Sequence, residues 1–180
     1  DTSQDTVTAP PAFDMVALSG SKTGALKLDG YTAPRADVVA GPIEKVMTQG
    51  TGGTTGGPQT STLASGAAAA SLDLLATEAG RRPDLHDAHA ALSAEHAELE
   101  HALLAAARGE PACSSESLRQ RANSHVLRCS QAALTATKGA GYLSDALAGR
   151  LCREALFFLV WSCPQPVQNA NLCELAGIAE

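Results

Sequence analysis

Apolar residues recur at helical spacing through most of the chain, in four long segments separated by Gly or Pro. The first helix is expected to start at Pro58–Ser61 and to end at Gly80. The other three predicted helices cover residues 85–107, 114–138 and 143–161, and a shorter one follows at 167–178. Long helices joined by short turns predict a mainly α fold built on an antiparallel four-helix bundle.

In the N-terminal part of the chain, apolar and polar residues alternate with the two-residue period of a β-strand. Residues Ala25–Tyr31 alternate, with Leu26 and Leu28 on one face, which predicts a half-buried strand. With the apolar stretch Phe13–Leu18, this predicts a β-hairpin or the tail of a sheet over residues 13–42, after a Thr- and Pro-rich loop at residues 1–11. Because two strands are not stable alone, their partners are expected outside this chain.

These patterns predict three parts. Residues 1–45 are the remnant of a β-sheet domain, residues 46–62 a glycine-rich linker, and residues 63–180 a helical bundle. Hydrophobic residues make up 44% of the chain but aromatic ones only 3%, so the core must consist mainly of Ala, Leu and Val. The net charge of −6 argues against a nucleic-acid or anionic-membrane surface. No apolar run approaches the roughly 20 residues of a membrane span.

Three groups of residues are candidates for chemistry. The stretch GTGGTTGG at residues 50–57 precedes a helix and is either an anion cradle or a mobile linker; it lacks the Lys of a Walker loop. Four histidines crowd the second predicted helix, where Glu98–His101 has the ExxH spacing of di-metal bundles. A matching second ExxH is absent, so the alternative is a solvated face of histidine and glutamate.

Five cysteines without a CxxC pair indicate free thiols in a reducing, cytoplasmic setting. Cys163 is a candidate nucleophile, but it follows the C-terminal end of a predicted helix, where the dipole raises a thiol pKa. A small buried thiol is therefore the favoured interpretation of Cys163.

Three stretches resemble the acyl-CoA dehydrogenase superfamily. GSKTGALKLDGYTAP, from Gly20 to Pro34, resembles a strand of that family in an ungapped register. LASGAAAASLDLL (63–75) resembles the first helix of its C-terminal bundle, and KGAGYLSDALAGRLCREALFF (138–158) resembles its glycine turn and R-x-x-R-D/E-A series. The resemblance covers residues 13–178. It implies the end of the middle β domain and the whole C-terminal helical domain, with the N-terminal portion of the same protein as a partner.

The resemblance implies FAD as cofactor and an acyl-CoA or similar thioester as substrate, which a Glu carboxylate deprotonates. Counting from Arg153 brings Trp161 onto the aromatic residue of the family's Y-E-G-T and Ser162 onto its Glu. A serine hydroxyl is not a base at neutral pH without help. Some members carry the Glu near the position of Thr60, but no Asp or Glu lies between Glu44 and Asp73.

The flavin contacts that the resemblance implies are Arg81, Arg82, Gly139, Gly141 and Trp161, with the two glycines approaching FAD bound across a dimer. A homodimer or homotetramer is therefore expected. Two hypotheses remain open: part of an acyl-CoA dehydrogenase-like flavoprotein oxidoreductase with an atypical or missing base, or a non-catalytic homologue that serves in assembly or ligand binding.

Overall fold

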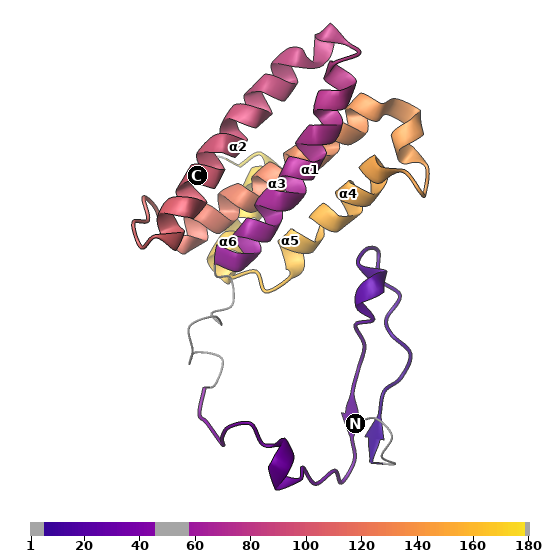
Figure 1. Ribbon diagram of the computed structural model, residues 1–180, viewed down its shortest axis with the longest axis vertical. Coiled ribbons are helices and arrows are strands. Elements are labelled where there is room, and N and C mark those ends of the chain that lie inside the picture. The colour runs from indigo at the N-terminus through magenta and orange to yellow at the C-terminus, as the bar shows by residue number, and fades with distance from the viewer. Residues whose placement is uncertain (1–5, 46–57, 179–180) are drawn as a thin grey trace. The chain divides into compact units, whose positions relative to one another are not determined.

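The structure, a computed structural model, describes residues 6–45 and 58–178 (Figure 1). The chain divides into two compact units, Asp1–Gly50 and Thr51–Glu180, which are described separately. Residues 46–57, which contain most of the predicted linker and the whole candidate anion cradle, lie outside the described residues.

The first unit is a small antiparallel hairpin. Strand β1 (Val7–Thr8) pairs with β2 (Lys27–Leu28), with Val7 opposite Leu28. Strand β2 lies inside the predicted Ala25–Tyr31 strand but is only two residues long, and its partner β1 lies before the predicted 13–42 segment. The first strand falls in the predicted N-terminal loop, where β-branched Val7 and Thr8 favour extended backbone.

The predicted half-burial of the second strand is wrong in this structure. Leu26 and Leu28 are 59% and 56% exposed, because a two-residue pairing gives their face nothing to pack against. A turn at η1 (Ser19–Ser21) and a later turn at η2 (Arg35–Asp37) complete the unit.

The second unit is helical. Its long helices are α1 (Pro58–Ala79), α2 (His86–Ala107) and α3 (Ser115–Thr137). The fourth arm consists of α4 (Leu147–Ala155) and α5 (Phe157–Val160), and α6 (Gln165–Ala176) follows. The arms run antiparallel side by side (Figure 1), which confirms the mainly α bundle with few strands. None of the helices in the described ranges is long and apolar enough to cross a membrane.

Helix α3 lies at the centre of the bundle, packed against α1, α2, α4 and α6. Alanines make the contact possible: Ala64 and Ala68 of α1 and Ala122 of α3 are fully buried. Small side chains let the helix backbones approach closely. Leucines such as Leu75 and Leu99 fill the volume that remains between the helices. The Ala- and Leu-rich core predicted from composition is present.

Several helix ends differ from the prediction. The first helix does start at Pro58, within the predicted Pro58–Ser61 start, so residues 58–62 at the end of the linker segment are helical. The fourth helix does not start at Leu143, which is extended (φ −67°, ψ 148°). The stop after α3 uses the left-handed backbone of Lys138 (φ 54°, ψ −148°), not a glycine. Ser114 caps α3, its Oγ accepting a hydrogen bond from the Ser117 amide at 3.1 Å.

Candidate functional site

Four of the predicted flavin contacts, Arg81, Arg82, Gly139 and Gly141, lie where the turn between α1 and α2 meets the end of α3. Arg82 follows α1 and donates a hydrogen bond from Nη2 to the carbonyl oxygen of Ala136. Glu78 pairs with both arginines, at 3.0 Å from Arg81 and 3.5 Å from Arg82. Ala136 lies three residues before Gly139, so this hydrogen bond places Arg82 close to the turn that carries Gly139.

That turn is η5 (Lys138–Tyr142), which contains both predicted glycines. Gly141 is buried, and a Cβ there would collide with Thr137 Oγ1 and lie 2.9 Å from Thr137 Cβ. Gly139 is exposed, and a Cβ there would meet nothing within 4 Å. Gly141 is thus needed for packing within the chain, whereas Gly139 leaves open space that a ligand could occupy.

The other predicted group lies just after α5. Trp161 is 54% exposed and stacks on Phe157, with ring centroids 5.3 Å apart. Ser162 is exposed and has a left-handed backbone (φ 43°), an uncommon conformation for a non-glycine residue. Within the described ranges, no hydrogen bond joins the Ser162 side chain to a carboxylate.

A buried arginine holds this turn. Arg119, near the start of α3, has no solvent exposure and donates from Nη2 to the carbonyl oxygens of Phe158 at 3.4 Å and Trp161 at 3.1 Å. Its Nε donates to Asn123 Oδ1 at 2.9 Å, and Asn123 donates in turn to Asn171 on α6. Burial lowers the pKa of the Arg119 guanidinium. These carbonyls belong to the C-terminal end of a helix, where a cation is favoured.

Sequence reasoning missed Arg119. Its signal was periodicity: Arg119, Asn123, Val126 and Ser130 follow one another at helical spacing, so three polar side chains share a face with the apolar Val126. A charged residue on such a face is rare unless it is paired, which makes it a candidate for a structural or functional role.

The two groups lie at opposite ends of α3 and do not form one site within a single chain. Arg119 marks the Ser162 end and Ala136 the glycine end, and the 17 steps from one residue to the other span about 25 Å at 1.5 Å per residue. Any ligand that touches both groups must therefore be long or must lie between two chains.

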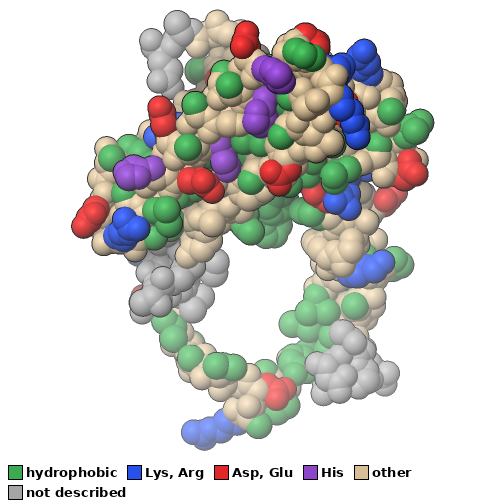
Figure 2. All heavy atoms as spheres, turned by 45° about the horizontal axis from the view of Figure 1, so that its top comes forward, with side chains coloured by type: hydrophobic (Ala, Val, Ile, Leu, Met, Phe, Trp, Pro, Cys, Tyr) green, Lys and Arg blue, Asp and Glu red, His purple; other side chains and the backbone are tan. Residues whose placement is uncertain are grey.

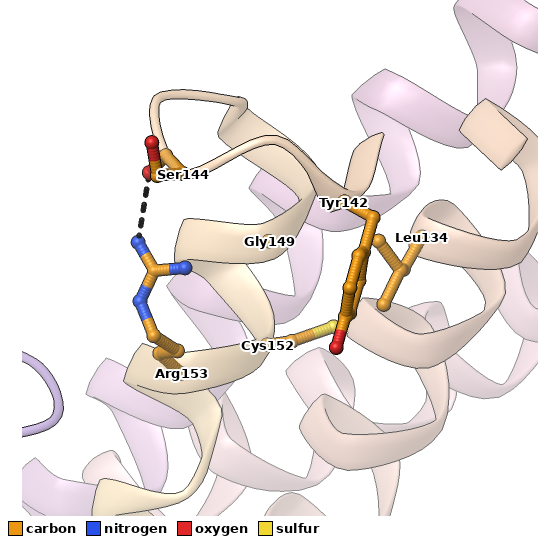
Figure 3. A pocket seen from close by; sticks show the side chains of 6 residues that line it. All are labelled: Leu134, Tyr142, Ser144, Gly149, Cys152 and Arg153. Carbon is orange, nitrogen blue, oxygen red and sulfur yellow. Dashed lines mark hydrogen bonds between the residues drawn. The ribbon is translucent and has the colours of Figure 1, made fainter. Parts of the chain in front are cut away.

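A hollow of about 450 Å³ opens beside α4 (Figure 3). It is lined by Leu134, Tyr142, Ser144, Gly149, Cys152 and Arg153. Arg153 donates to the carbonyl oxygen of Ser144 at 3.4 Å, and the Cys152 thiol donates to that of Ser130 at 3.2 Å. Burial raises the pKa of Cys152, so its thiol stays protonated at neutral pH.

Histidine side chains gather on one face of the helical unit, with carboxylates nearby (Figure 2). The expected solvated face is correct for His101, but His96 is buried and stacks on the buried His125 of α3, with centroids 5.3 Å apart. His125 Nδ1 lies 3.6 Å from Glu95 Oε1, and Glu95 forms a two-pronged ion pair with Arg128. In residues 6–45 and 58–178, no group of three or more ligating side chains could hold a metal ion.

The cysteines are unpaired, but Cys163 is not fully buried as favoured above; it is half-buried. It lies past the C-terminal end of α5 and two residues before the N-terminal end of α6, so the dipoles of both helices act on it. Cys129 is buried beside His125, and burial raises its pKa to about 12.

The chemistry of the two groups differs. Arg82, which bonds to Ala136, and Lys138 supply cations near the exposed Gly139, and this would suit the diphosphate of a flavin nucleotide. Glu78 partly neutralises Arg81 and Arg82. The Ser162 end offers a hydroxyl and an exposed indole, and among the described residues no carboxylate bonds to Ser162, which does not fit proton abstraction from a thioester. The arrangement can bind a nucleotide more readily than it can perform acid–base chemistry.

Solved structures share this fold. A chain of the electron transferring flavoprotein structure from Acidaminococcus fermentans, determined in work on flavin-based electron bifurcation, has a TM-score of 0.71 and 17% identity over 96% of this chain. Glutaryl-coenzyme A dehydrogenase in its glutaryl-CoA complex has a TM-score of 0.70 and 14% identity over 97%. This chain spans 50% and 48% of those chains. No family model matches the sequence, and no curated protein matches it significantly.

Proposed function

We propose that this chain is the C-terminal half of a flavoprotein of the acyl-CoA dehydrogenase superfamily that lacks the usual carboxylate base. The observation that carries the proposal is the fold likeness, which spans nearly the whole chain and includes a glutaryl-CoA dehydrogenase. The resemblance of the strand, the first bundle helix and the glycine turn supports it independently.

In this proposal Arg81, Arg82 and Gly139 hold the nucleotide part of FAD, while Trp161 lies against the flavin and Ser162 occupies the position of the base. When bound, the flavin would accept a hydride from an acyl-CoA or similar thioester. The chain's own residues bind and orient, because Ser162 cannot take up a proton unaided. A cytoplasmic homodimer or homotetramer is the expected form.

Flavin binding tests the proposal. The full-length protein is purified, scanned for flavin absorbance and titrated with FAD. Gly139→Leu is expected to weaken FAD binding at least about tenfold, because its side chain would fill the space beside the diphosphate. Gly66→Leu is the matched control, since Gly66 is also exposed with open space around it, but on α1. A protein that binds no FAD, or equal affinity in both variants, would contradict the proposal.

The missing carboxylate favours the second hypothesis, a non-catalytic homologue that serves in assembly or ligand binding. Restoring a carboxylate at residue 162 distinguishes the oxidoreductase from the non-catalytic homologue. If FAD is bound, Ser162→Glu is expected to raise anaerobic bleaching of the flavin by a panel of acyl-CoAs, while Ser162→Gln, of the same shape but uncharged, is not. Equal bleaching by both variants would show that residue 162 does not face the substrate.

A further inference from the structure

A buried arginine in the helical unit has no carboxylate partner among the described residues. Arg119 has no solvent exposure, and its hydrogen bonds go to two backbone carbonyl oxygens and to the amide oxygen of Asn123. Its Nη1 has no hydrogen-bond partner within the described ranges. Burying an unpaired charge is costly, so this guanidinium offers a free donor and a positive charge to an anion.

Cys163 lies close to this guanidinium. Arg119 Nη2 is 3.1 Å from the carbonyl oxygen of Trp161, and Cys163 follows Trp161 by two residues, which span at most about 7 Å of chain. Burial lowers the pKa of the Arg119 guanidinium, and a negative charge on Cys163 opposes this effect, so the two groups interact electrostatically. Because Arg119 is closed to solvent, an anion that reaches it has to be part of the protein.

The start of α6 adds to the positive potential at Cys163. Cys163 directly precedes Pro164, which is the N-cap residue of this twelve-residue helix. No side chain accepts a hydrogen bond from the first amides of α6 at this cap. The N-terminal end of a helix stabilises negative charge. A cysteine beside an arginine and before a helix has the surroundings of a reactive thiol.

A small reagent can also reach Cys163, because the residue is only half-buried. Two other cysteines are less suited to reaction. Cys129 is fully buried, and burial raises its pKa to about 12. Cys152 is half-buried, but its thiol donates to the Ser130 carbonyl oxygen, and burial raises its pKa as well. Exposure and positive surroundings are thus combined at Cys163.

We propose that Cys163 is a site of reversible oxidation to a sulfenic acid, with Arg119 and the start of α6 stabilising negative charge on its sulfur and on the oxygen that it acquires. The oxidant is hydrogen peroxide. The thiolate sulfur attacks one peroxide oxygen, so a sulfur–oxygen bond forms while the oxygen–oxygen bond breaks. The sulfur gives two electrons to the peroxide, whose second oxygen leaves as hydroxide and takes a proton from solvent to become water.

The oxidised state gives Arg119 the partner that its Nη1 lacks. The new oxygen accepts a hydrogen bond from Nη1, while Nη2 keeps its bond to the Trp161 carbonyl oxygen. Hydrogen bonds that involve a charged group are stronger than those between neutral groups. Oxidation therefore adds a second contact between α3 and the turn that carries Trp161 and Ser162. This site does not rest on the flavoprotein proposal, because no flavin takes part.

Trapping the sulfenic acid tests the site in the unmodified chain. The full-length protein is reduced, treated with hydrogen peroxide in the presence of dimedone, which alkylates sulfenic acids, and digested for mass spectrometry. Cys113 and Cys173 are internal controls, because both are half-buried as Cys163 is. Cys113 directly precedes the Ser114 cap of α3, and Cys173 lies near the C-terminal end of α6. We expect Cys163 to be labelled at least about fivefold faster than either control.

Substitution of Arg119 separates its role from that of the helix. Arg119→Gln removes the charge but keeps a donor, and it is expected to slow the labelling of Cys163 at least about fivefold. Arg119→Lys keeps the charge and should label faster than Arg119→Gln. Arg121→Gln removes an arginine from the same helix and is the matched control, with a rate within about twofold of the unmodified chain. Labelling of the buried Cys129 reveals a variant that has unfolded.

Three outcomes would overturn the site. They are labelling of Cys163 no faster than that of Cys113 and Cys173, an unchanged rate in folded Arg119→Gln, and a peroxide product at Cys163 that dithiothreitol does not reverse when dimedone is left out. The last would be a sulfinic or sulfonic acid and not a sulfenic acid. The comparison within the unmodified chain decides the proposal even where Arg119→Gln does not fold. The assay contains no added flavin, so its result is independent of FAD binding.

Discussion

Arg119 on α3 holds the carbonyl oxygen of Trp161 at 3.1 Å, across 42 residues of sequence. The arginine is fully buried, and its partners are two backbone carbonyls and one amide oxygen, not a carboxylate. Its Nη1 has no partner among the described residues. The buried guanidinium of Arg119 therefore holds the turn that presents Trp161 and Ser162.

Removing Arg119 is expected to loosen this turn. Arg119→Ala leaves a cavity and two unsatisfied carbonyls, so the free energy of unfolding should fall by about 2–4 kcal/mol. Trp161 is the only tryptophan, and its fluorescence reports the turn directly. We expect its emission to shift to longer wavelength well below the global melting temperature. Arg119→Lys, which keeps the charge and one donor, should lose less stability; equal losses would show that volume alone matters.

The helices were predictable because their signal is local and repetitive. Leucine spacing and the Gly and Pro stops located the four arms. The break before α4 was not predicted, because Leu143 continues the apolar period while its backbone is extended. Tertiary packing, not propensity, decides such ends.

Gly139 and Gly141 look alike in sequence but should respond differently to substitution. Gly141→Ala forces its Cβ against Thr137, so we expect a loss of about 1–3 kcal/mol from overpacking. Gly139→Ala meets open space and should leave stability unchanged within about 0.5 kcal/mol. Thermal unfolding measures both.

The double variant Thr137→Ala, Gly141→Ala provides the control. Removing the Thr137 hydroxyl relieves the worst collision, so the double variant should be more stable than the sum of the single losses predicts. Strict additivity would show that the two residues are not in contact.

Lys138 ends α3 with a positive φ, although it is not a glycine. Its backbone (φ 54°, ψ −148°) strongly favours glycine over residues with a Cβ. Lys138→Gly is therefore expected to raise the free energy of unfolding by about 1 kcal/mol. Lys138→Ala keeps the Cβ and should bring no gain, so a gain common to both variants would point to the charge and not to the backbone.

The candidate site was predictable only in part. The positions of Ser162, Gly139 and Gly141 came from local motifs, but their separation along α3 depends on how the arms pack. Arg119 and the stacked His96 and His125 were missed because burial of a polar side chain is a property of the assembled bundle. Whether such a residue is exposed or buried depends on the other helices that pack against it, and one local stretch of sequence does not show them.

The buried histidine pair predicts a stability that depends on pH. Burial lowers the pKa of His125 below its ordinary value of 6.5, against the opposing pull of Glu95. Between that lowered pKa and 6.5 the unfolded chain binds more protons than the folded one, so stability should fall as pH decreases through this window. The hydrogen bond from Arg128 lowers the pKa of Glu95 below 4.5, which adds a second loss at more acidic pH.

The two losses can be separated by substitution. His125→Gln removes the upper window and keeps a polar side chain of similar size, so its stability should be flat near pH 6 and fall only with Glu95. His101→Gln on the exposed face of α2 is the control and should retain both windows. Denaturant unfolding followed at closely spaced pH values measures each curve. An unchanged slope near pH 6 in His125→Gln would contradict the assignment of the upper window to His125.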